Sequence, residues 1–291
     1  MKDISVKALA KINLGLDVVR KREDGYHEVR MVMQTIHLFD RLEISKNTSG
    51  EITMETNLSF LPTNENNLVY KAAKLLQDEF AIKDGVHVCL HKYIPVAAGM
   101  AGGSTDAAAV LYGMNQIFDL GLTREELMER GVKIGADVPY CIMRGTALAE
   151  GIGEKLSKLP PMVKCPVLIA KPQISVSTKF VYENLKLGSD MVHPDIDRLV
   201  ADIREKDLYK IAADMGNVLE TVTIPAYPVI ADIKDHMMEH GAVNAMMSGS
   251  GPTVFGLFDK EATAVEAYEA MKASGLAKQV YLTSIYNNAR K

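Results

Sequence analysis

A run of small residues at positions 95–106 is the part of this sequence best suited to binding a phosphate group. It reads Pro-Val-Ala-Ala-Gly-Met-Ala-Gly-Gly-Ser-Thr-Asp and joins a predicted strand to a predicted helix with Ser104 as its N-cap. Such residues let backbone amides approach an anion closely, and the start of a helix carries about half a positive charge. The hydroxyl groups of Ser104 and Thr105 could also contact phosphate or magnesium.

Two common nucleotide-binding motifs do not fit this run. The loop Gly-x-x-x-x-Gly-Lys-Ser/Thr requires a lysine that is missing here, and Gly-x-Gly-x-x-Gly requires glycines at other positions. A segment rich in glycine and alanine is also typical of a tight connection between a strand and a helix. The phosphate interpretation therefore depends on other parts of the chain.

Three polar residues are candidates for catalysis or binding because of where the sequence pattern places them. Apolar residues at every even position from Ile4 to Leu16 predict a half-buried strand, with Lys11 and Asn13 on its polar face. Asp137 follows a helix predicted over 124–134, within Gly-Ala-Asp-Val-Pro, where glycine and proline end helical structure. A solvent-facing lysine, a cross-strand polar pair and a helix-capping aspartate are the structural alternatives for these three positions.

Predicted strands and helices alternate along the chain around these residues. Asp24-Gly25 predicts a hairpin whose second strand covers 29–38, and β character continues over 41–54. Further periodicities predict helices over 68–80, 104–118, 124–134, 196–203, 230–238 and 262–271, and strands over 86–90, 167–170, 243–246, 254–258 and 280–283. The pattern predicts an α+β protein, which a linker at 159–161 divides into domains 1–160 and 161–291.

The composition narrows the classes of function. The 291 residues carry a net charge of −4 with a pI near 6.0, so no basic field is available to hold a nucleic-acid backbone. Cys89, Cys141 and Cys165 show neither Cys-x-x-Cys spacing nor a metal-ligand pattern, and we interpret them as reduced and buried. The N-terminus lacks a leader pattern and no segment is apolar over the width of a bilayer, which predicts a cytoplasmic protein without a membrane partner.

Several motifs, spread over nearly the whole chain, resemble those of the GHMP kinases, the superfamily of galactokinase, homoserine kinase, mevalonate kinase and phosphomevalonate kinase. They are Ala-Lys-Ile-Asn-Leu at 10–14, Asp-Gly-Tyr-His at 24–27, the loop from Pro95 with Gly-Gly-Ser-Thr-Asp-Ala-Ala at 102–108, Gly-Ala-Asp-Val-Pro at 135–139, and Ser-Gly-Ser-Gly-Pro at 248–252. Met100 and Ala101 depart from the usual leucine and glycine, and Thr105 from a serine. The added glycine and acid resemble the branch whose substrate carries a cytidine diphosphate group.

This resemblance implies a two-domain GHMP kinase fold of the α+β class, with an N-terminal domain like domain 2 of ribosomal protein S5 and a ferredoxin-like C-terminal domain. ATP and an alcohol substrate would meet in the cleft between them. Asp137 would accept the proton of the substrate hydroxyl, and Lys11 would hold Asp137 ionised and stabilise the transferring charge. The ATP phosphates would be bound by Pro95, Val96, Ala97, Ala98, Gly99, Met100, Ala101, Gly102, Gly103, Ser104 and Thr105.

The binding of adenosine, substrate and metal is likewise implied only by the resemblance. Asn67 and Lys92 fall where the family lines the adenosine pocket, although a helix cap and a surface lysine are equally compatible. Magnesium would be held by phosphates and hydroxyls, because no acid matching a dedicated protein metal site is found. A structural or exposed histidine is the alternative for His27, and a strand-joining turn is the alternative for the 249–251 loop. The cytidine-bearing substrate would contact Asn13, Tyr26, His27, Tyr182, Gly249, Ser250 and Gly251, with the two tyrosines stacking on cytosine.

Three rival interpretations are compatible with the same residues: a GHMP kinase for another alcohol, a family member that binds without catalysis, and an S5-like RNA-binding protein. The Asp-Gly-Tyr-His turn favours the cytidine-bearing substrate. The joint presence of Lys11 and Asp137 favours catalysis, and the net negative charge disfavours RNA. A homodimer is compatible with the sequence.

Overall fold

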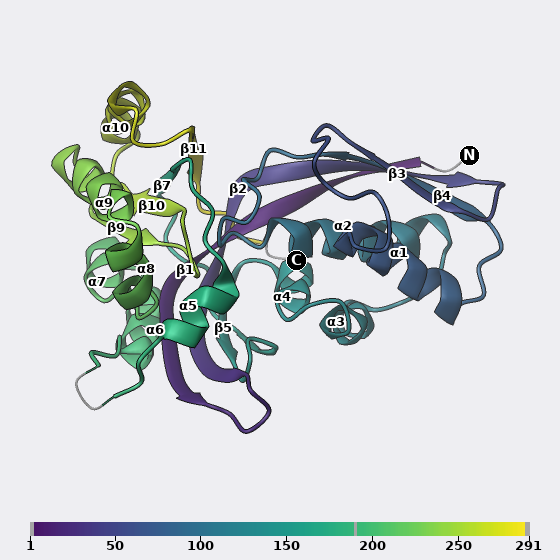
Figure 1. Ribbon diagram of the computed structural model, residues 1–291, viewed down its shortest axis with the longest axis horizontal. Helices are drawn as coiled ribbons and strands as arrows, with labels where there is room; N and C mark the ends of the chain where they lie inside the picture. The colour runs from purple at the N-terminus through teal and green to yellow at the C-terminus, as the bar shows by residue number, and fades with distance from the viewer. Residues whose placement is uncertain (1–2, 189–190, 289–291) are drawn as a thin grey trace. The chain divides into compact units, whose positions relative to one another are not determined.

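The computed structural model describes residues 3–188 and 191–288 (Figure 1). The chain divides into two compact units, which are built from interleaved segments. The first unit contains β1 (Asp3–Lys21) up to Ala10, together with Phe39–Val96 and Ala101–Met143; the second contains Lys11–Leu38, Ala97–Met100 and the chain from Arg144 onward. The long strands β1 and β2 (His27–Asn47) therefore contribute residues to both units.

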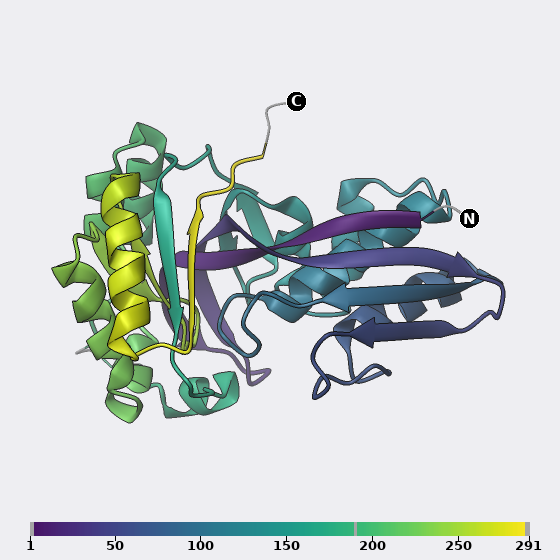
Figure 2. The ribbon, with the colours of Figure 1, turned by 90° about the horizontal axis from the view of Figure 1, so that it is seen from above.

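The first unit is a sheet with helices on one face (Figures 1 and 2). In it, β3 pairs with β4 in parallel, and β4 pairs antiparallel with the last part of β2. Helix α2 packs closely against β2, because a Cβ atom at Gly113 would lie 2.4 Å from Cδ1 of Ile44. The elements added here are β3 (Ile52–Thr56), α1 (Leu68–Glu79), β4 (Gly85–His91), α2 (Gly102–Ile117), α3 (Arg124–Val132) and α4 (Val138–Met143).

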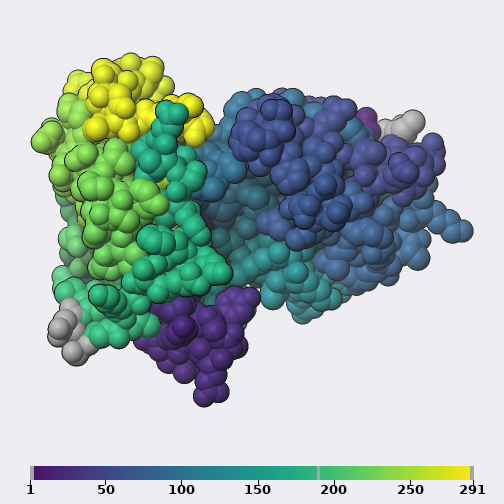
Figure 3. Space-filling model, viewed as in Figure 1, coloured from purple at the N-terminus to yellow at the C-terminus, as the bar shows by residue number. Residues whose placement is uncertain are grey.

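The second unit begins with the hairpin formed by the inner parts of β1 and β2. Gly15 of β1 pairs in parallel with Gly216 of β8 (Gly216–Asn217), and Met31 of β2 pairs antiparallel with Ala149 of β5 (Thr146–Glu150). Strand β6 (Lys155–Lys158) continues this sheet beside β5. Figure 3 shows the turn of the hairpin, in purple, at the surface beside the teal segment that contains α5 (Thr178–Asn184).

A separate four-stranded antiparallel sheet, in the order β11-β7-β10-β9, forms the rest of the second unit. Helix α9 packs on β9 and β10, where a Cβ atom at Gly256 would lie 3.0 Å from Sδ of Met237, and α10 packs on β7 and β11. The residues Val167 to Ala170 of β7 are fully buried. The remaining bounds are β7 (Pro166–Lys171), α6 (Ile196–Glu205), α7 (Leu208–Ala213), α8 (Glu220–Ala226), α9 (Val229–Glu239), β9 (Asn244–Met247), β10 (Val254–Leu257), α10 (Glu261–Ser274) and β11 (Gln279–Ser284).

The longer predicted elements are confirmed, and two details of the prediction are wrong. The half-buried strand predicted over 4–16 is found only at its start, where Ser5 and Lys7 are exposed; from Ala8 to Val18 β1 is buried on both faces. Within this stretch Lys11, Asn13 and Asp17 form hydrogen bonds with protein groups. The helix expected to begin at Ser104 begins at Gly102, and its N-cap is Ala101 in the left-handed region at φ 55°, without a side-chain cap.

The elements that the sequence pattern missed are short. Helices α4, α5, α7 and α8 have six or seven residues, and strands β5, β6 and β8 have two to five. Segments of this length carry too little periodicity to be distinguished from loops. The boundary between domains 1–160 and 161–291 stays a prediction. Within 3–188 and 191–288, no helix has the length and apolar character needed to span a bilayer.

Candidate active site

Lys11 and Asn13 form a buried polar pair on β1 of the second unit. Their exposed fractions are 5% and 0%, and Nζ of Lys11 donates to Oδ1 of Asn13 at 2.6 Å. The same ammonium group donates to the backbone carbonyl of Gly99 at 3.0 Å, and the amide of Lys11 donates to the carbonyl of Met100 at 3.3 Å. The lysine that the sequence placed on a polar strand face is therefore fixed against the small-residue loop.

The backbone of the small-residue loop is unusual in its dihedral angles. Ala97, Gly99 and Ala101 have φ values of 51°, 70° and 55°. For alanine this left-handed conformation costs roughly 1–2 kcal/mol, so the chain retains strain at two positions. Alternation between left-handed and ordinary conformations turns successive N–H groups toward one side, which is the geometry of an anion-binding backbone nest.

In the second unit this loop lies directly against the loop that follows β9. A Cβ atom at Gly99 would lie 2.0 Å from the carbonyl oxygen of Ser248, and the Ser248 hydroxyl donates to the carbonyl of Gly99 at 3.0 Å. Gly249 also lies beside Asn13, since a Cβ atom at Gly249 would be 3.6 Å from Oδ1 of Asn13, an ordinary van der Waals distance. The hydroxyl groups of Thr178 and Ser250 are hydrogen-bonded at 2.8 Å. Lys11, Asn13, the 97–100 segment and the 248–250 segment thus form one cluster.

In the first unit, a buried charge network lies beneath the start of α2. The ammonium group of Lys92 pairs with the carboxylates of Asp40 and Asp106, the second at 2.7 Å, and all three residues are buried. Asp40 also accepts the backbone amides of Tyr93 and Ile94 at 2.5 and 2.8 Å. The network therefore anchors the chain that enters the loop. The alternative of a surface lysine at position 92 is therefore wrong, because Lys92 is buried.

The charges of this network are set by burial and by their neighbours. Burial alone would lower the pKa of Lys92, but the carboxylates of Asp106 and Asp40 outweigh it and raise the pKa above its ordinary value. Burial raises the pKa of Asp106 well above its ordinary value, and the negative charge of Asp40 acts in the same direction. A Cβ at Gly102 would lie 3.2 Å from Nζ of Lys92, so a cationic group lies under the first turn of α2.

Asp137 and Asn67, also in the first unit, both stand at the starts of helices. Asp137 directly precedes α4, is half-buried, and its carbonyl accepts the amide of Cys141 at 3.1 Å. Asn67 caps α1, with Oδ1 accepting the amide of Val69 at 2.9 Å and Nδ2 donating to the carbonyl of Pro62 at 2.8 Å. The helix-cap alternative for Asn67 is confirmed, while its adenosine role stays a prediction.

Two of the three residues predicted to hold cytosine are in contact. The rings of His27 and Tyr182 lie 5.0 Å apart between centroids with an interplanar angle of 38°. Burial lowers the pKa of His27, and the positive charge of Lys21 acts in the same direction, so this imidazole is neutral at neutral pH. Tyr26 is 61% exposed at the hairpin turn, which makes its ring available to a ligand.

The sequence reasoning assigned no role to Asp40, Asp106 or Ser248. Asp106 and Ser248 stand inside the quoted loop motifs, so their proximity to the predicted residues was a usable signal. Asp40 lies in no motif, and nothing local distinguishes it from a strand-end aspartate. Its partnership with Lys92 spans 52 positions and exists only in the folded chain.

Comparison with known proteins places these residues within a family. The model of the GHMP kinases N terminal domain matches residues 67–145, and that of the GHMP kinases C terminal matches residues 199–277. The two matches include the 95–105 loop, Asp137 and the 249–251 loop.

Individual relatives are similar over nearly the full chain. A 4-diphosphocytidyl-2-C-methyl-D-erythritol kinase of Lachnospira eligens is 57% identical over 98% of this chain and 99% of its own length. A protein of the same name from Acetivibrio thermocellus is 51% identical over 94% and 96%. A crystal structure of 4-(cytidine 5'-diphospho)-2C-methyl-D-erythritol kinase matches with a TM-score of 0.84 and 29% identity over 98% and 100%. The homoserine kinase of Cytophaga hutchinsonii shares the fold, with a TM-score of 0.81 at 20% identity over 99% and 95%.

Proposed function

We propose that this chain, which belongs to the GHMP kinase family and within it to the 4-diphosphocytidyl-2-C-methyl-D-erythritol kinases, phosphorylates the 2-hydroxyl of that cytidyl substrate. It is an ATP-dependent kinase, and its family has the two-domain GHMP kinase fold. One structural observation supports this proposal most, namely the buried ammonium group of Lys11 held between Asn13 and the carbonyl of Gly99.

The phosphates of ATP would be bound mainly by backbone. The first-turn amides of α2 at Gly102, Gly103 and Ser104 have no acceptor within the helix, because a helix leaves its first N–H groups unpaired. Such amides suit an anion without a lysine in the loop, and in the second unit the left-handed positions at Ala97 and Gly99 would offer further backbone N–H groups. Lys92, beneath Gly102, is paired with the carboxylates of Asp40 and Asp106, so it would support the phosphates by fixing the start of α2 rather than by adding net positive charge or by touching adenosine.

Proton transfer is assigned to Asp137. In phosphoryl transfer the substrate oxygen attacks the γ-phosphorus, the bond from that phosphorus to the bridging oxygen breaks, and ADP leaves. The hydroxyl proton passes to the Asp137 carboxylate. Lys11 would stabilise the charge that develops on the transferring group, because an ammonium group fixed by Asn13 and Gly99 needs no reorganisation during the reaction.

The cytidyl substrate would be recognised in the second unit. A neutral His27 ring can donate from one nitrogen and accept at the other, which suits the donor and acceptor edge of cytosine. Tyr182 in contact with His27, and the exposed ring of Tyr26, offer aromatic faces for stacking. Asn13 and the 249–251 loop would face the methylerythritol and diphosphate parts of the substrate.

Magnesium fits the donor set that the chain offers. It prefers oxygen ligands in octahedral geometry and retains several waters, so phosphate oxygens and one or two protein oxygens suffice. The hydroxyl groups that would complete its shell are those of Ser104, which is half-buried in the first turn of α2, and of Thr105, which is buried. When bound, the ion would neutralise phosphate charge.

Three further assignments belong to the same proposal. The relatives' names support a place in isoprenoid synthesis by the non-mevalonate route. We also propose a cytoplasmic location, and the division into domains 1–160 and 161–291. A homodimer would be compatible with this activity.

The deciding experiment follows ADP release with ATP, magnesium and 4-diphosphocytidyl-2-C-methyl-D-erythritol, with homoserine, mevalonate and galactose as competing acceptors. It compares wild type, Asp137→Asn and Asp84→Asn, where Asp84 is an exposed aspartate of the same unit. We expect turnover of the cytidyl substrate alone, a loss of about 10²–10⁴-fold in Asp137→Asn, and full activity in Asp84→Asn. Phosphorus-to-carbon coupling in the product's NMR spectrum would identify the modified hydroxyl.

The other outcomes separate the parts of the proposal. Turnover of a different alcohol would retain the kinase and remove the substrate assignment. An active Asp137→Asn variant would remove the base, and coupling at another carbon would remove the 2-hydroxyl. A salt-sensitive shift of RNA without any nucleotide turnover would favour a binding protein.

A further inference from the structure

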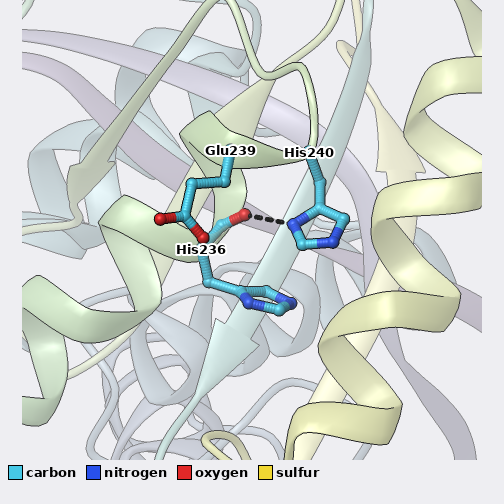
Figure 4. Close-up of side chains that lie close together, drawn as sticks. All are labelled: His236, Glu239 and His240. Atoms are coloured by element: carbon cyan, nitrogen blue, oxygen red, sulfur yellow. Dashed lines mark hydrogen bonds between the residues drawn. The ribbon is translucent and has the colours of Figure 1, made fainter.

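The C-terminal end of α9, in the second unit, gathers three side chains of the kinds that bind metals. His236, Glu239 and His240 have the spacing i, i+3 and i+4, which places them on one face of a helical turn (Figure 4). One ring nitrogen from each histidine and one carboxylate oxygen lie within 4.8 Å of one another. Nitrogen and oxygen ligands about 2.0–2.1 Å from a zinc ion lie about 3.4 Å apart in tetrahedral geometry, so small side-chain rotations bring all three onto one ion.

One nitrogen of the cluster lacks a hydrogen-bond partner among the described residues. Nε2 of His236 is buried and has no hydrogen-bond partner among the described residues. A buried polar atom without a partner is costly, and native structures leave few of them. A bound cation would satisfy this nitrogen without any change in the backbone.

The imidazole of His240 is already oriented by a hydrogen bond. Nδ1 of His240 lies 2.8 Å from the carbonyl oxygen of His236, as the dashed line in Figure 4 shows. Because a carbonyl only accepts, Nδ1 carries the proton, and Nε2 of the neutral ring keeps its lone pair for a ligand. A backbone carbonyl on the distal nitrogen is the usual way in which a metal-binding histidine is held in its tautomer.

The helix terminus provides a favourable potential and a rigid frame. The last carbonyls of a helix carry a partial negative charge, which favours a cation there. Gly241 ends the turn at φ 85°, and a Cβ at this position would lie 2.6 Å from Cγ2 of Thr263 on α10. The ligands therefore stand on a helix end whose geometry is fixed by packing.

We propose that His236, Glu239 and His240 form a binding site for a divalent transition-metal ion of the zinc class. Two imidazoles and one carboxylate suit zinc, cobalt and nickel, whereas magnesium takes an all-oxygen shell. Three protein ligands leave a position open for water or a further ligand. This site is independent of the proposed kinase chemistry.

A competition titration with a chromophoric chelator, using zinc alone and no nucleotide, tests the proposal on the full chain. The variants are His236→Gln, Glu239→Gln and His240→Gln, each of which keeps a polar side chain of similar size. The controls are Glu266→Gln, an exposed acid on α10, and Cys89→Ala, because Sγ of Cys89 lies 3.4 Å from Nε2 of His91 and could itself hold zinc. Circular dichroism and thermal unfolding without metal check that each variant folds.

We expect one zinc per chain, affinity weakened at least about tenfold in every cluster variant, unchanged affinity in both controls, and no competition by magnesium. Zinc should also raise the midpoint of thermal unfolding of the wild type and not that of Glu239→Gln. Zinc affinity equal to wild type in the cluster variants would overturn the site, as would affinity lost only in Cys89→Ala. Glu239 is exposed, so its variant carries the test if a histidine variant fails to fold.

Discussion

At the scale of single residues, Lys11 is notable because its charged group is buried among neutral partners. It is buried, yet its described partners are the neutral oxygens of Asn13 and Gly99. A buried ammonium group is costly unless it is hydrogen-bonded or meets negative charge, and a phosphate group would supply that charge.

For Lys11→Met we expect kcat to fall roughly 10²–10³-fold, because one preorganised charge at the transferring group is lost while side-chain volume is kept. Initial rates at saturating ATP and cytidyl substrate measure this. Lys83→Met, which changes an exposed lysine, should leave kcat unchanged. A Lys11→Met variant that folds and retains wild-type kcat contradicts the role.

We expect His27 to make the KM for the cytidyl substrate depend on pH. Its pKa is lowered by burial and by Lys21, so the ring gains its proton only below the ordinary value of 6.5. The KM for the cytidyl substrate should therefore be constant between pH 8 and about 6.5 and rise below it, as the ring loses its accepting nitrogen. His27→Gln should lack this rise. An inflection above pH 6.5, or the same rise in the variant, would exclude His27 as its origin.

At the scale of elements, the contact between the 97–100 segment and the loop after β9 depends on a glycine. Gly99 combines φ of 70° with a carbonyl 2.0 Å from the position of a Cβ atom. Gly121 has a similar φ of 72°, but a Cβ atom there would meet nothing within 4 Å. A substitution at Gly121 therefore measures the cost of the backbone conformation without a steric clash.

Gly121→Ala should therefore lower the free energy of unfolding by roughly 1–2 kcal/mol and leave kcat/KM for ATP unchanged. Gly99→Ala should lower both quantities, and the free energy by more than Gly121→Ala does. Chemical denaturation and steady-state kinetics on the two variants give the comparison. Equal effects would mean that the close approach to Ser248 is not required.

The charge network beneath α2 should contribute to the stability of the fold. Lys92→Met leaves two buried carboxylates without their cation, which should lower the free energy of unfolding by about 3–5 kcal/mol. Lys74→Met breaks the exposed pair with Asp78 and should cost about 0.5 kcal/mol or less. Urea denaturation of both variants provides the measurement. Similar losses in the two would show that the buried network adds no stability.

At the scale of the whole molecule, Cys165 links stability to alkaline pH. Burial raises the pKa of its thiol from 9.0 to about 12, so the folded chain holds this proton where the unfolded chain releases it. The stabilisation is complete below pH 9 and is lost as pH rises toward 12, by about 1.4 kcal/mol per pH unit. The free energy of unfolding between pH 8 and 11 should fall more steeply in wild type than in Cys165→Ala. Parallel curves would contradict this.

Much of this protein could be read from local sequence. Helices α1, α9 and α10 carry enough apolar periodicity to be located within a few residues, since one face of each is buried. The small residues at 95–105 likewise predict a backbone anion site, because conformational freedom and low bulk are properties of the residues themselves. The Asp-Gly turn of the β1–β2 hairpin is equally local.

Contacts between distant positions could be learned only from the folded structure. Lys92 was compatible with a surface lysine until β2 and α2 brought two carboxylates to it, and β1 was expected to face water on one side. Gly99 and Ser248 are 149 positions apart, and His27 meets Tyr182 across a similar span. Periodicity reports which face of an element is apolar. It does not report what covers that face, because burial and hydrogen-bond partners depend on how elements pack.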